Sequence, residues 1–441
     1  MSSKLLIEKT SLVHKYAIVE EKILKYIRVM VLDKPRVDEI YLGKVEKYNK
    51  TMGSAFVNIG DHTVFLMSDQ SLAEGETRLV QITREAEKTK LARASLDITI
   101  GGEYAVLILN SDTIKASKKT RGNPGTIELM EELAKIHDAS YGILLRSKAD
   151  IGNIELVKEE IEKNSALLKS LKSDGLGLKY SSFDENEYIQ NLASSYRVIK
   201  IISNHDETIK EIKKLRMTDI SLDYDPIFLF NRNSINMETF LNPTFESEGV
   251  SLTINFLEAL CIIDVDSGHI SSDSIKKIQF KRINERAFIK ALEVIELMEI
   301  SGIIVIDLIS MDKETTKDFD KFVSQNLKKF LKNLKVVAYP TSGAGLLQLI
   351  IEKRESGLVP EISRICDKCH GSGLVLSTDM TSDAFEIELL SKIKHSNNHD
   401  FVVTIPRDLE KDKRETMMQI CQLHGATCSF KECCTNKIRI E

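Results

Sequence analysis

The sequence predicts a multidomain α+β protein. Its 441 residues are too many for one ordinary domain, and 42% of them are hydrophobic, enough for several cores. Short β-type runs separated by turn residues fill residues 39–110, a pattern typical of a small barrel. A helical segment lies between two apolar strands within residues 250–338, which indicates a βαβ-type unit. We therefore expect a β-rich module early in the chain and an α/β module beyond its middle.

The first 36 residues read as a β-hairpin, formed by LLIEKT and YAIVEEKILKYIRVMV. A lone hairpin is only marginally stable, so these strands should pair with a later segment. From Asp112 a basic loop containing Gly and Pro leads into a helix and the strand YGILLRS. A long amphipathic helix follows over about Ile154–Leu171, and we expect its apolar stripe to face a core.

Charge and hydropathy exclude two classes of protein. The formal net charge of -5 argues against a protein that coats nucleic acid by bulk charge, although local basic patches remain possible. No uncharged apolar run reaches the length of a membrane span, and the N-terminus lacks the apolar core of a secretory signal. We expect a cytoplasmic protein without a membrane span.

Seven cysteines, one pair of which is closely spaced, indicate a reduced protein with a metal site rather than a disulfide framework. In CDKCHGSG, Cys366 and Cys369 have zinc-knuckle spacing, and glycines follow that let the backbone turn around a metal. One pair is half of a tetrahedral zinc site, so the other ligands come from elsewhere in the chain or from a second copy. Four cysteines and a histidine near the C-terminus could supply them, but their placement on a helix and a strand favours a structural role: Cys421, Cys428, Cys433, Cys434 and His424.

Three aspartates close the two apolar strands of the βαβ-type unit. Asp264 and Asp266 end CIIDVD, and Asp307 ends GIIVID. Ligands bind at the carboxyl ends of strands in α/β sheets, and carboxylate oxygens suit magnesium, so these residues are candidates for a magnesium site. The alternative is a simple Asp-Ser-Gly turn, with Asp307 capping the next element.

Taken in order, LLIEKT, EIYLGKVEKYNKTMGSAFVNIG, YGILLRS, FLEALCIIDVDSG, SGIIVIDLISMD and CDKCHGSG resemble the bacterial ribonuclease E/G family from end to end. The length is similar to that of the shorter, ribonuclease G-like members, and the chain looks like a divergent one. The resemblance implies seven segments: residues 1–36 and 179–240 as two parts of a ribonuclease H-like subdomain, 37–110 as an OB-fold RNA-binding barrel, 111–178 as a 5′-sensor region, 241–362 as a deoxyribonuclease I-like catalytic subdomain, 363–374 as a zinc link and 375–441 as a small C-terminal α/β domain.

The resemblance also implies an activity. Asp264 and Asp307 would bind Mg²⁺ for hydrolysis of a phosphodiester in single-stranded RNA, with water as nucleophile and a 5′-phosphate on the product. Asp266 would belong to the same catalytic group. Cys366 and Cys369 would bind Zn²⁺ together with the same pair of a second chain, which implies a homodimer and possibly a homotetramer.

RNA-binding residues follow from the same resemblance. Phe56 and Phe65 match stacking aromatics of the barrel, although one of them could instead be barrel core, and Lys90 matches a lysine that contacts the RNA backbone. Arg146 and Ser147 match an Arg-Thr pair that reads a 5′ monophosphate.

The chain departs from the family pattern at several positions. Asp266 stands where the family has Asn, the helix EVIELMEI lacks family arginines, and Gly-Ala-Gly345 replaces Arg-Phe-Gly. Each change removes positive charge or adds negative charge near RNA. The sensor loop lacks its usual glycines but carries Lys115, Lys118, Lys119 and Arg121. Two other functions therefore stay open: an RNA-binding homologue without turnover, and a zinc-organised structural protein.

Overall fold

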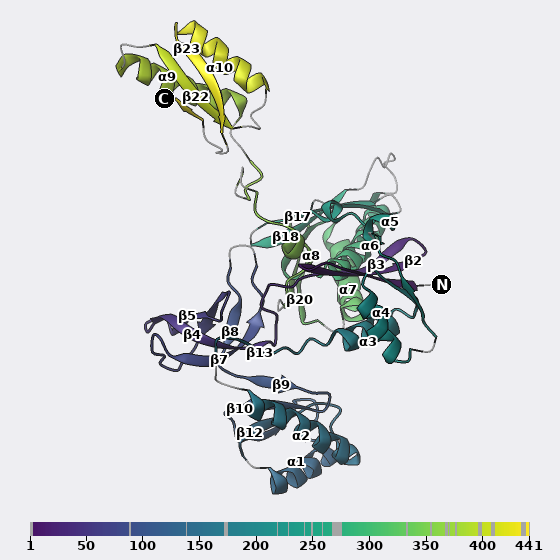
Figure 1. The fold of residues 1–441 in the computed structure, drawn as a ribbon. Coiled ribbons are helices and arrows are strands. Elements are labelled where there is room, and N and C mark those ends of the chain that lie inside the picture. Colours follow the sequence, from purple (N-terminus) through teal and green to yellow (C-terminus); the bar gives the residue numbers. More distant parts are fainter. Residues whose placement is uncertain are drawn as a thin grey trace. The chain divides into compact units, whose positions relative to one another are not determined.

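The computed structural model describes residues 3–440 except 88–89, 138, 172–174, 218, 228, 242, 248–249, 258, 267–275, 332–333, 353–354, 367–368, 370, 375–376, 396–398, 407–410 and 434–437. The chain divides into two compact units, Met1–Ser363 and Arg364–Glu441. The structure confirms a mixed α+β protein built from several sheets (Figure 1). Within the described residues, no helix is both long and apolar enough to cross a membrane.

The N-terminal strands belong to a five-stranded sheet of order β15-β14-β1-β2-β3. Its strands are β1 (Ser3–Lys9), β2 (Val13–Glu20), β3 (Ile23–Val31), β14 (Val198–Ser203) and β15 (Ser221–Tyr224). Helices α3 (Glu185–Ser195) and α4 (Asp206–Lys214) contact β14. Strand β1 pairs with β14 in parallel, so the predicted hairpin does find its partner far along the chain.

A five-stranded barrel of the OB type follows. Its strands are β4 (Ile40–Asn49), β5 (Ser54–Asn58), β6 (Thr63–Met67), β7 (Thr77–Arg84) and β8 (Arg93–Ser95). Pairing of β4 with β7 closes the barrel, and β13 (Gly177–Tyr180) adds to the outside of β4. Alternating side chains such as Val57 and Leu66 fill its interior. The predicted barrel is confirmed.

The run Tyr104–Leu109, which we grouped with the barrel from its sequence, pairs in the next sheet instead. That sheet contains β9 (Thr99–Gly101), β10 (Ala105–Leu109), β11 (Ile114–Ala116) and β12 (Tyr141–Leu145). It packs with α1 (Pro124–Ile136), the 3-10 turn η1 (Ile151–Asn153) and α2 (Ile154–Ser170) around a shared core. The apolar stripe of α2 is buried there, as expected.

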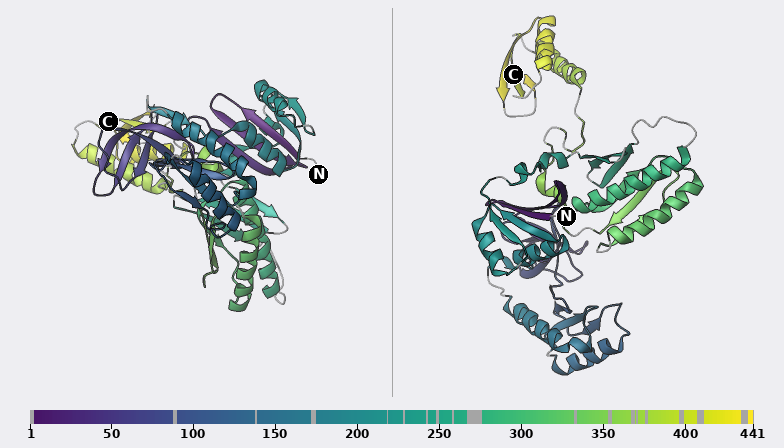
Figure 2. Two further views of the ribbon diagram at one scale, coloured as in Figure 1. Left: turned by 90° about the horizontal axis from the view of Figure 1, so that it is seen from below. Right: turned by 90° about the vertical axis from the view of Figure 1, so that its right-hand side faces the viewer.

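A six-stranded sheet forms the largest core of the protein. Its strands are β16 (Thr244–Ser247), β17 (Val250–Phe256), β18 (Leu260–Asp266), β19 (Gly302–Asp307), β20 (Val336–Tyr339) and β21 (Leu346–Ile351), in the order β16-β17-β18-β19-β21-β20. Helices α6 (Lys276–Leu297) and α7 (Lys313–Phe330) lie side by side against one face, as the right-hand view of Figure 2 shows. Shorter helices are α5 (Leu229–Arg232), η2 (Met237–Phe240) and α8 (Leu358–Ile362). Strands β18 and β19 are parallel neighbours joined through α6, so the βαβ prediction is confirmed.

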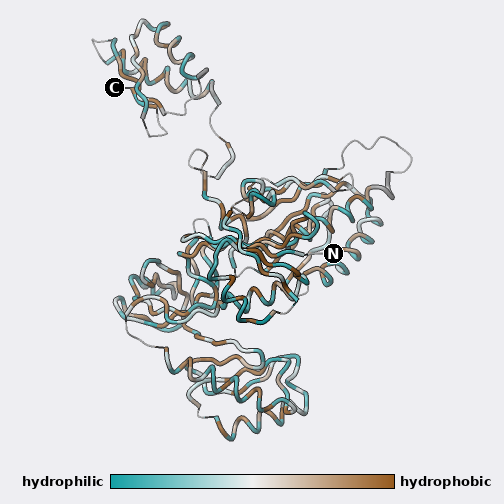
Figure 3. The backbone as a smooth tube through the Cα atoms, turned by 45° about the vertical axis from the view of Figure 1, so that its right-hand side comes forward, coloured by the Kyte–Doolittle hydropathy of each residue, from teal (hydrophilic) through white to brown (hydrophobic). Residues whose placement is uncertain are grey.

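The unit Arg364–Glu441 has its own small core. It contains α9 (Thr378–His395), β22 (Asp400–Pro406), α10 (Lys411–Leu423), β23 (Thr427–Cys433) and β24 (Arg439–Ile440), with strand order β23-β22-β24. Both units carry hydrophobic residues along their strands and helices (brown in Figure 3), and these residues pack into separate cores.

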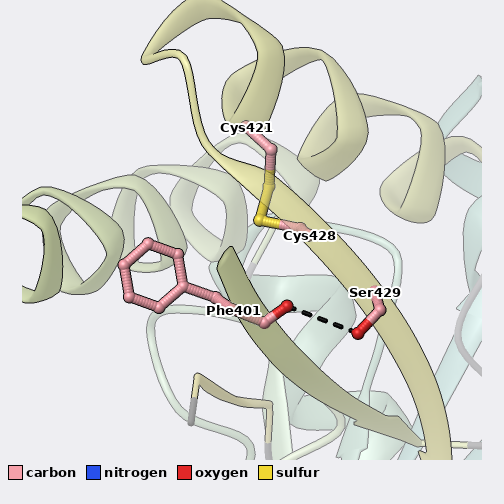
Figure 4. Close-up of a disulfide and its surroundings, with 4 residues drawn as sticks. All are labelled: Phe401, Cys421, Cys428 and Ser429. Atoms are coloured by element: carbon pink, nitrogen blue, oxygen red, sulfur yellow. Dashed lines mark hydrogen bonds between the residues drawn. A yellow bond between two sulfur atoms is a disulfide. The ribbon is translucent and has the colours of Figure 1, made fainter. Parts of the chain in front are cut away.

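A disulfide joins Cys421, at the end of α10, to Cys428 at the start of β23 (Figure 4). The expectation that the cysteines are all reduced is therefore wrong for this pair. The two cysteines are seven residues apart in sequence, and the turn between the helix and the strand brings their Cα atoms to 6.3 Å.

Candidate functional site

Asp264 and Asp307 are direct neighbours in the six-stranded sheet. Parallel pairing of β18 with β19 sets Cys261 beside Ile304 and ends with Asp264 beside Asp307. The preceding residues Ile263 and Ile306 are fully buried against the helices, and alternation then turns both carboxylates to the opposite face. The apolar strands thus bring two exposed acids together, as their positions in the sequence predict.

Asp266 lies on the same side of β18, two residues beyond Asp264 and next to Ser251 of β17. Three exposed carboxylates therefore lie at one corner of the sheet. Among the described residues, no group of three or more His, Cys, Asp or Glu side chains is arranged to hold a metal ion. The structure accordingly confirms neither magnesium nor zinc. Residues 267–275, which follow Asp266, lie outside the described residues.

The loop that follows Asp307 is held from two sides. Asn284 of α6 is completely buried, and its side-chain amide donates to the carbonyl oxygen of Ile309 at 2.8 Å. The backbone N–H of Ile309 donates back to the same side chain at 3.1 Å. Leu308 donates its N–H to the carbonyl oxygen of Gly345, whose φ of +85° suits glycine. These contacts fix the chain direction immediately after the Asp307 carboxylate.

The barrel presents two aromatic rings on its surface. Phe56 of β5 and Phe65 of β6 are paired in register, and their ring centroids are 5.8 Å apart. Phe56 is 41% exposed and Phe65 is half-buried, and neither belongs to the barrel core. Both line a cavity of about 320 Å³ together with Lys90. The geometry suits an aromatic platform with a cation beside it.

Arg146 and Ser147 directly follow β12, and both side chains are exposed. The backbone N–H of Arg146 donates to the carbonyl oxygen of Tyr104 at 2.7 Å, which fixes the start of this turn. Strand β11 runs parallel to β12 and carries Lys115 beside Leu144. Lys115 and Arg146 thus lie near the end of β12, where Glu103 pairs with Lys148 and the Glu160 carboxylate accepts from the N–H of Tyr104.

A model of the ribonuclease E/G family matches residues 99–354, more than half of the chain. The chain belongs to the ribonuclease E/G family. It is 24% identical over 379 residues to ribonuclease E of Nostoc sp. (strain PCC 7120 / SAG 25.82 / UTEX 2576), covering 77% of this chain and 54% of that protein. It is 21% identical over 453 residues to ribonuclease G of Escherichia coli (strain K12), covering 91% of this chain and 90% of that protein.

The chain thus spans about half the length of the Nostoc ribonuclease E and nearly all of the E. coli ribonuclease G. A third relative, ribonuclease E of Synechocystis sp. (strain ATCC 27184 / PCC 6803 / Kazusa), is 24% identical over 381 residues, covering 77% of this chain and 55% of that protein. These homologues in the ribonuclease E/G family are endoribonucleases, which hydrolyse RNA. The resemblance read from the sequence is confirmed at the level of the family, and the low identities agree with a divergent member.

The two cysteines of the CDKC motif are thiols and take no part in a disulfide. Cys366 is exposed and Cys369 is half-buried. The N–H and hydroxyl of Ser372 both donate to the carbonyl oxygen of Cys369, at 2.9 and 2.7 Å, which closes a turn after the motif. Cys421 and Cys428 are bonded to each other and so cannot ligate zinc in this state, while Cys434 lies outside the described residues.

Sequence reasoning missed several residues of this ribonuclease E/G chain. Arg84 and Arg93 line the same barrel cavity as Phe56 and Phe65, and the only hint in the sequence is that they end and begin β-type runs. Asn284 was missed as well. One hint was present in its surroundings, because Asn284 is a polar residue that lies between the apolar residues Ile283 and Ala287 of the same helix.

A buried ion-pair network connects the barrel to the segment after β21. Arg36 contacts Glu85 at 3.2 Å and Glu361 at 3.1 Å, and the N–H of Ser356 donates to Glu85 at 2.7 Å. Burial raises the pKa of Glu85 by more than Arg36 lowers it. Burial alone would also raise the pKa of Glu361, but Arg36 and Lys34 together hold that pKa below its ordinary value.

Proposed function

We propose that the chain is a magnesium-dependent endoribonuclease that hydrolyses single-stranded RNA during RNA processing or decay. The observation that carries this proposal is the register pairing of Asp264 with Asp307 on the exposed face of a sheet, in a chain of the ribonuclease E/G family. Two carboxylates with exposed oxygens match the one or two that magnesium sites commonly use together with substrate phosphate. Bound there, magnesium would supply Lewis acidity and an activated water for attack on the phosphodiester.

The remaining site residues receive roles by their chemistry. Phe56 and Phe65 stack unpaired bases, and Lys90 binds a backbone phosphate beside them. Arg146 offers a guanidinium fork and Ser147 a hydroxyl to a terminal 5′ phosphate. Asp266 adds a third carboxylate next to the pair, which favours cation binding but repels the phosphate of the substrate.

By the same proposal, the N-terminal sheet is the ribonuclease H-like part and the six-stranded sheet with α6 and α7 is the deoxyribonuclease I-like catalytic part. Cys366 and Cys369 bind Zn²⁺ with the same pair of a second chain and so form a homodimer, two of which can form a tetramer. Replacing both cysteines with Ser should release zinc and lower the mass in solution. Unchanged zinc content and mass would disprove the shared site.

Cleavage of a 5′-monophosphorylated, single-stranded oligoribonucleotide tests the proposed activity. We expect cleavage with magnesium, none with a chelator, and none after Asp264→Asn or Asp307→Asn. Asp223→Asn is the matched control, because Asp223 is an exposed strand aspartate of a different sheet. A 5′-hydroxyl version of the same RNA should be cut more slowly, and Arg146→Ala should abolish that difference.

A second candidate function is RNA binding without turnover. Asp266 favours it, because this exposed third carboxylate adds negative charge where an anionic phosphate must approach. Tight binding of the oligonucleotide without magnesium-dependent cleavage would support this alternative. Recovery of cleavage in Asp266→Asn would then identify the third carboxylate as the cause.

A further inference from the structure

The uncovered face of the six-stranded sheet changes from apolar to acidic along its strands. Residues that pair in register and point away from α6 and α7 form rows across this open face. The first row is Leu260, Ile303, Ile350 and Val337; the second is Ile262, Val305, Gln348 and Tyr339; the third is Asp264, Asp307 and Leu346. The two carboxylates therefore border an apolar surface on the side of β21 and β20, whereas polar Thr253 and Asn255 of β17 pair with Asp264 and Ile262 on the other side.

Several members of the first two rows are exposed although they are apolar. Tyr339 is 47% exposed, Val337 52% and Ile303 45%. Their strand neighbours Val336 and Ala338 pack into the core under the sheet, which fixes the outward direction of Val337 and Tyr339. Tyr339 is the aromatic member of these rows, and it stands on the edge strand β20.

Tyr339 is close to the acid pair. It lies two strands from Asp307 and one row before it. With strand spacing of about 4.8 Å and about 6.6 Å between rows, the two backbone positions are roughly 12 Å apart. A tyrosine side chain covers part of that separation. A base stacked on Tyr339 would therefore belong to a nucleotide close to the phosphate that binds at Asp264 and Asp307.

We propose that Tyr339, flanked by Val337 and Ile350, is a stacking platform for an unpaired base of single-stranded RNA next to the site of cleavage. The inference rests on the proposed function and adds a binding subsite to it. Aromatic side chains on the face of a sheet stack bases of any sequence, since every base has a π-face.

The charges around the open face favour RNA as its occupant. At the first row, Leu260 and Ile303 line a cavity of about 110 Å³ whose charged residues are Arg84, Lys90, Glu87 and Glu299. In the adjoining barrel cavity, the cations Arg84, Lys90 and Arg93 outnumber the acids Glu85 and Glu87. Arg84 also lies 3.9 Å from Glu87, a long contact that leaves the guanidinium one-third exposed. A ligand that meets cations at one end, apolar surface in the middle and carboxylates suited to magnesium at the other matches an oligonucleotide. A second copy of this chain would match only the apolar middle.

The test measures affinity for a fluorescent single-stranded oligoribonucleotide in the Asp307→Asn background, so that no cleavage is needed. Tyr339→Ala should weaken binding by roughly 5- to 150-fold, the range for loss of one stacked base. Tyr339→Phe keeps the ring and should change affinity by less than about twofold. Tyr224→Ala is the matched control, because Tyr224 is 48% exposed on β15 of the N-terminal sheet and should leave binding unchanged.

An RNA with one abasic nucleotide, moved along the sequence, locates the stacked base. When the abasic nucleotide stands at the position whose base stacks on Tyr339, near the cleaved bond, the parent and Tyr339→Ala proteins should bind the RNA with equal affinity. Equal binding of intact RNA by the parent, Tyr339→Ala and Tyr224→Ala proteins would overturn the inference. A drop in solution mass on Tyr339→Ala with unchanged RNA affinity would also overturn it, and would assign the face to contact between copies. If RNA binding depends on Tyr339 but the unmodified chain cleaves no RNA, the proposed endoribonuclease activity is refuted and the stacking role of Tyr339 stands.

Discussion

Truncation of Asn284 to Ala should loosen the loop behind Asp307. The substitution removes both hydrogen bonds between this buried side chain and Ile309, at 2.8 and 3.1 Å. Each buried group left without a partner costs roughly 1 to 3 kcal/mol, and because Ile309 is half-buried we expect about 2 to 3 kcal/mol in total. That free energy corresponds to roughly 30- to 150-fold faster amide exchange at Ile309.

Hydrogen–deuterium exchange of a peptide covering residues 304–311 measures this change directly. Asn326→Ala is the control, since the side-chain amide of Asn326 donates to the carbonyl oxygen of Phe322 in its own helix. Asn284→Asp keeps the acceptor for the Ile309 N–H and should give an intermediate effect. If the RNA is cleaved, Asn284→Ala should lower kcat while KM stays constant, because Asn284 is buried away from RNA. A change in exchange of less than about threefold would show that the loop is held by other contacts.

Three further predictions concern stability. Arg36→Met should cost about 3 to 5 kcal/mol in urea unfolding, because it removes the cation that pairs with buried Glu85 and leaves buried Glu361 with Lys34 alone, and a cost below about 1 kcal/mol would refute this. Since the folded-state pKa of Glu361 lies below its ordinary value, its stabilisation is present above pH 4.5 and is lost as the pH falls through the folded value. Glu361→Gln should therefore flatten the loss of stability below pH 4.5, which denaturation between pH 6 and 3 will show. Reduction of the Cys421–Cys428 disulfide opens the short covalent loop that this bond closes, and should destabilise Arg364–Glu441 by about 2.5 kcal/mol without changing exchange in residues 1–363.

Local patterns in the sequence predicted much of the fold. Apolar runs ending in Asp264 and Asp307 predicted two parallel strands with neighbouring acids, because hydrophobic periodicity and the βαβ rule act locally. The residue pattern alone indicated that the N-terminal hairpin needs a partner but not which one, because β1 pairs with β14 almost 200 residues further along the chain. Only the family resemblance assigned residues 179–240, which contain β14, to the same subdomain.

The parts that escaped prediction are contacts between distant segments. Asn284 and Arg36 look like ordinary polar residues until their surroundings bury them, because no periodicity marks a side chain that bonds a remote backbone or carboxylate. The disulfide was missed for a different reason. Cysteine counts in the sequence suggested a reduced protein, whereas the turn after α10 brings Cys421 to Cys428.

The catalytic candidate depends on one strand register between segments that are about forty residues apart in sequence. Shifting β19 by a single residue against β18 would turn Asp307 toward the face covered by α6 and α7, among the rings of Phe288 and Phe319. A chain of this kind can therefore vary in length between the strands but not within them. Insertions in the connection after α6 leave the acid pair intact, whereas deletion of one residue from Gly302–Asp307 would move Leu308 into the exposed position beside Asp264 and Asp307 into the buried position of Ile306.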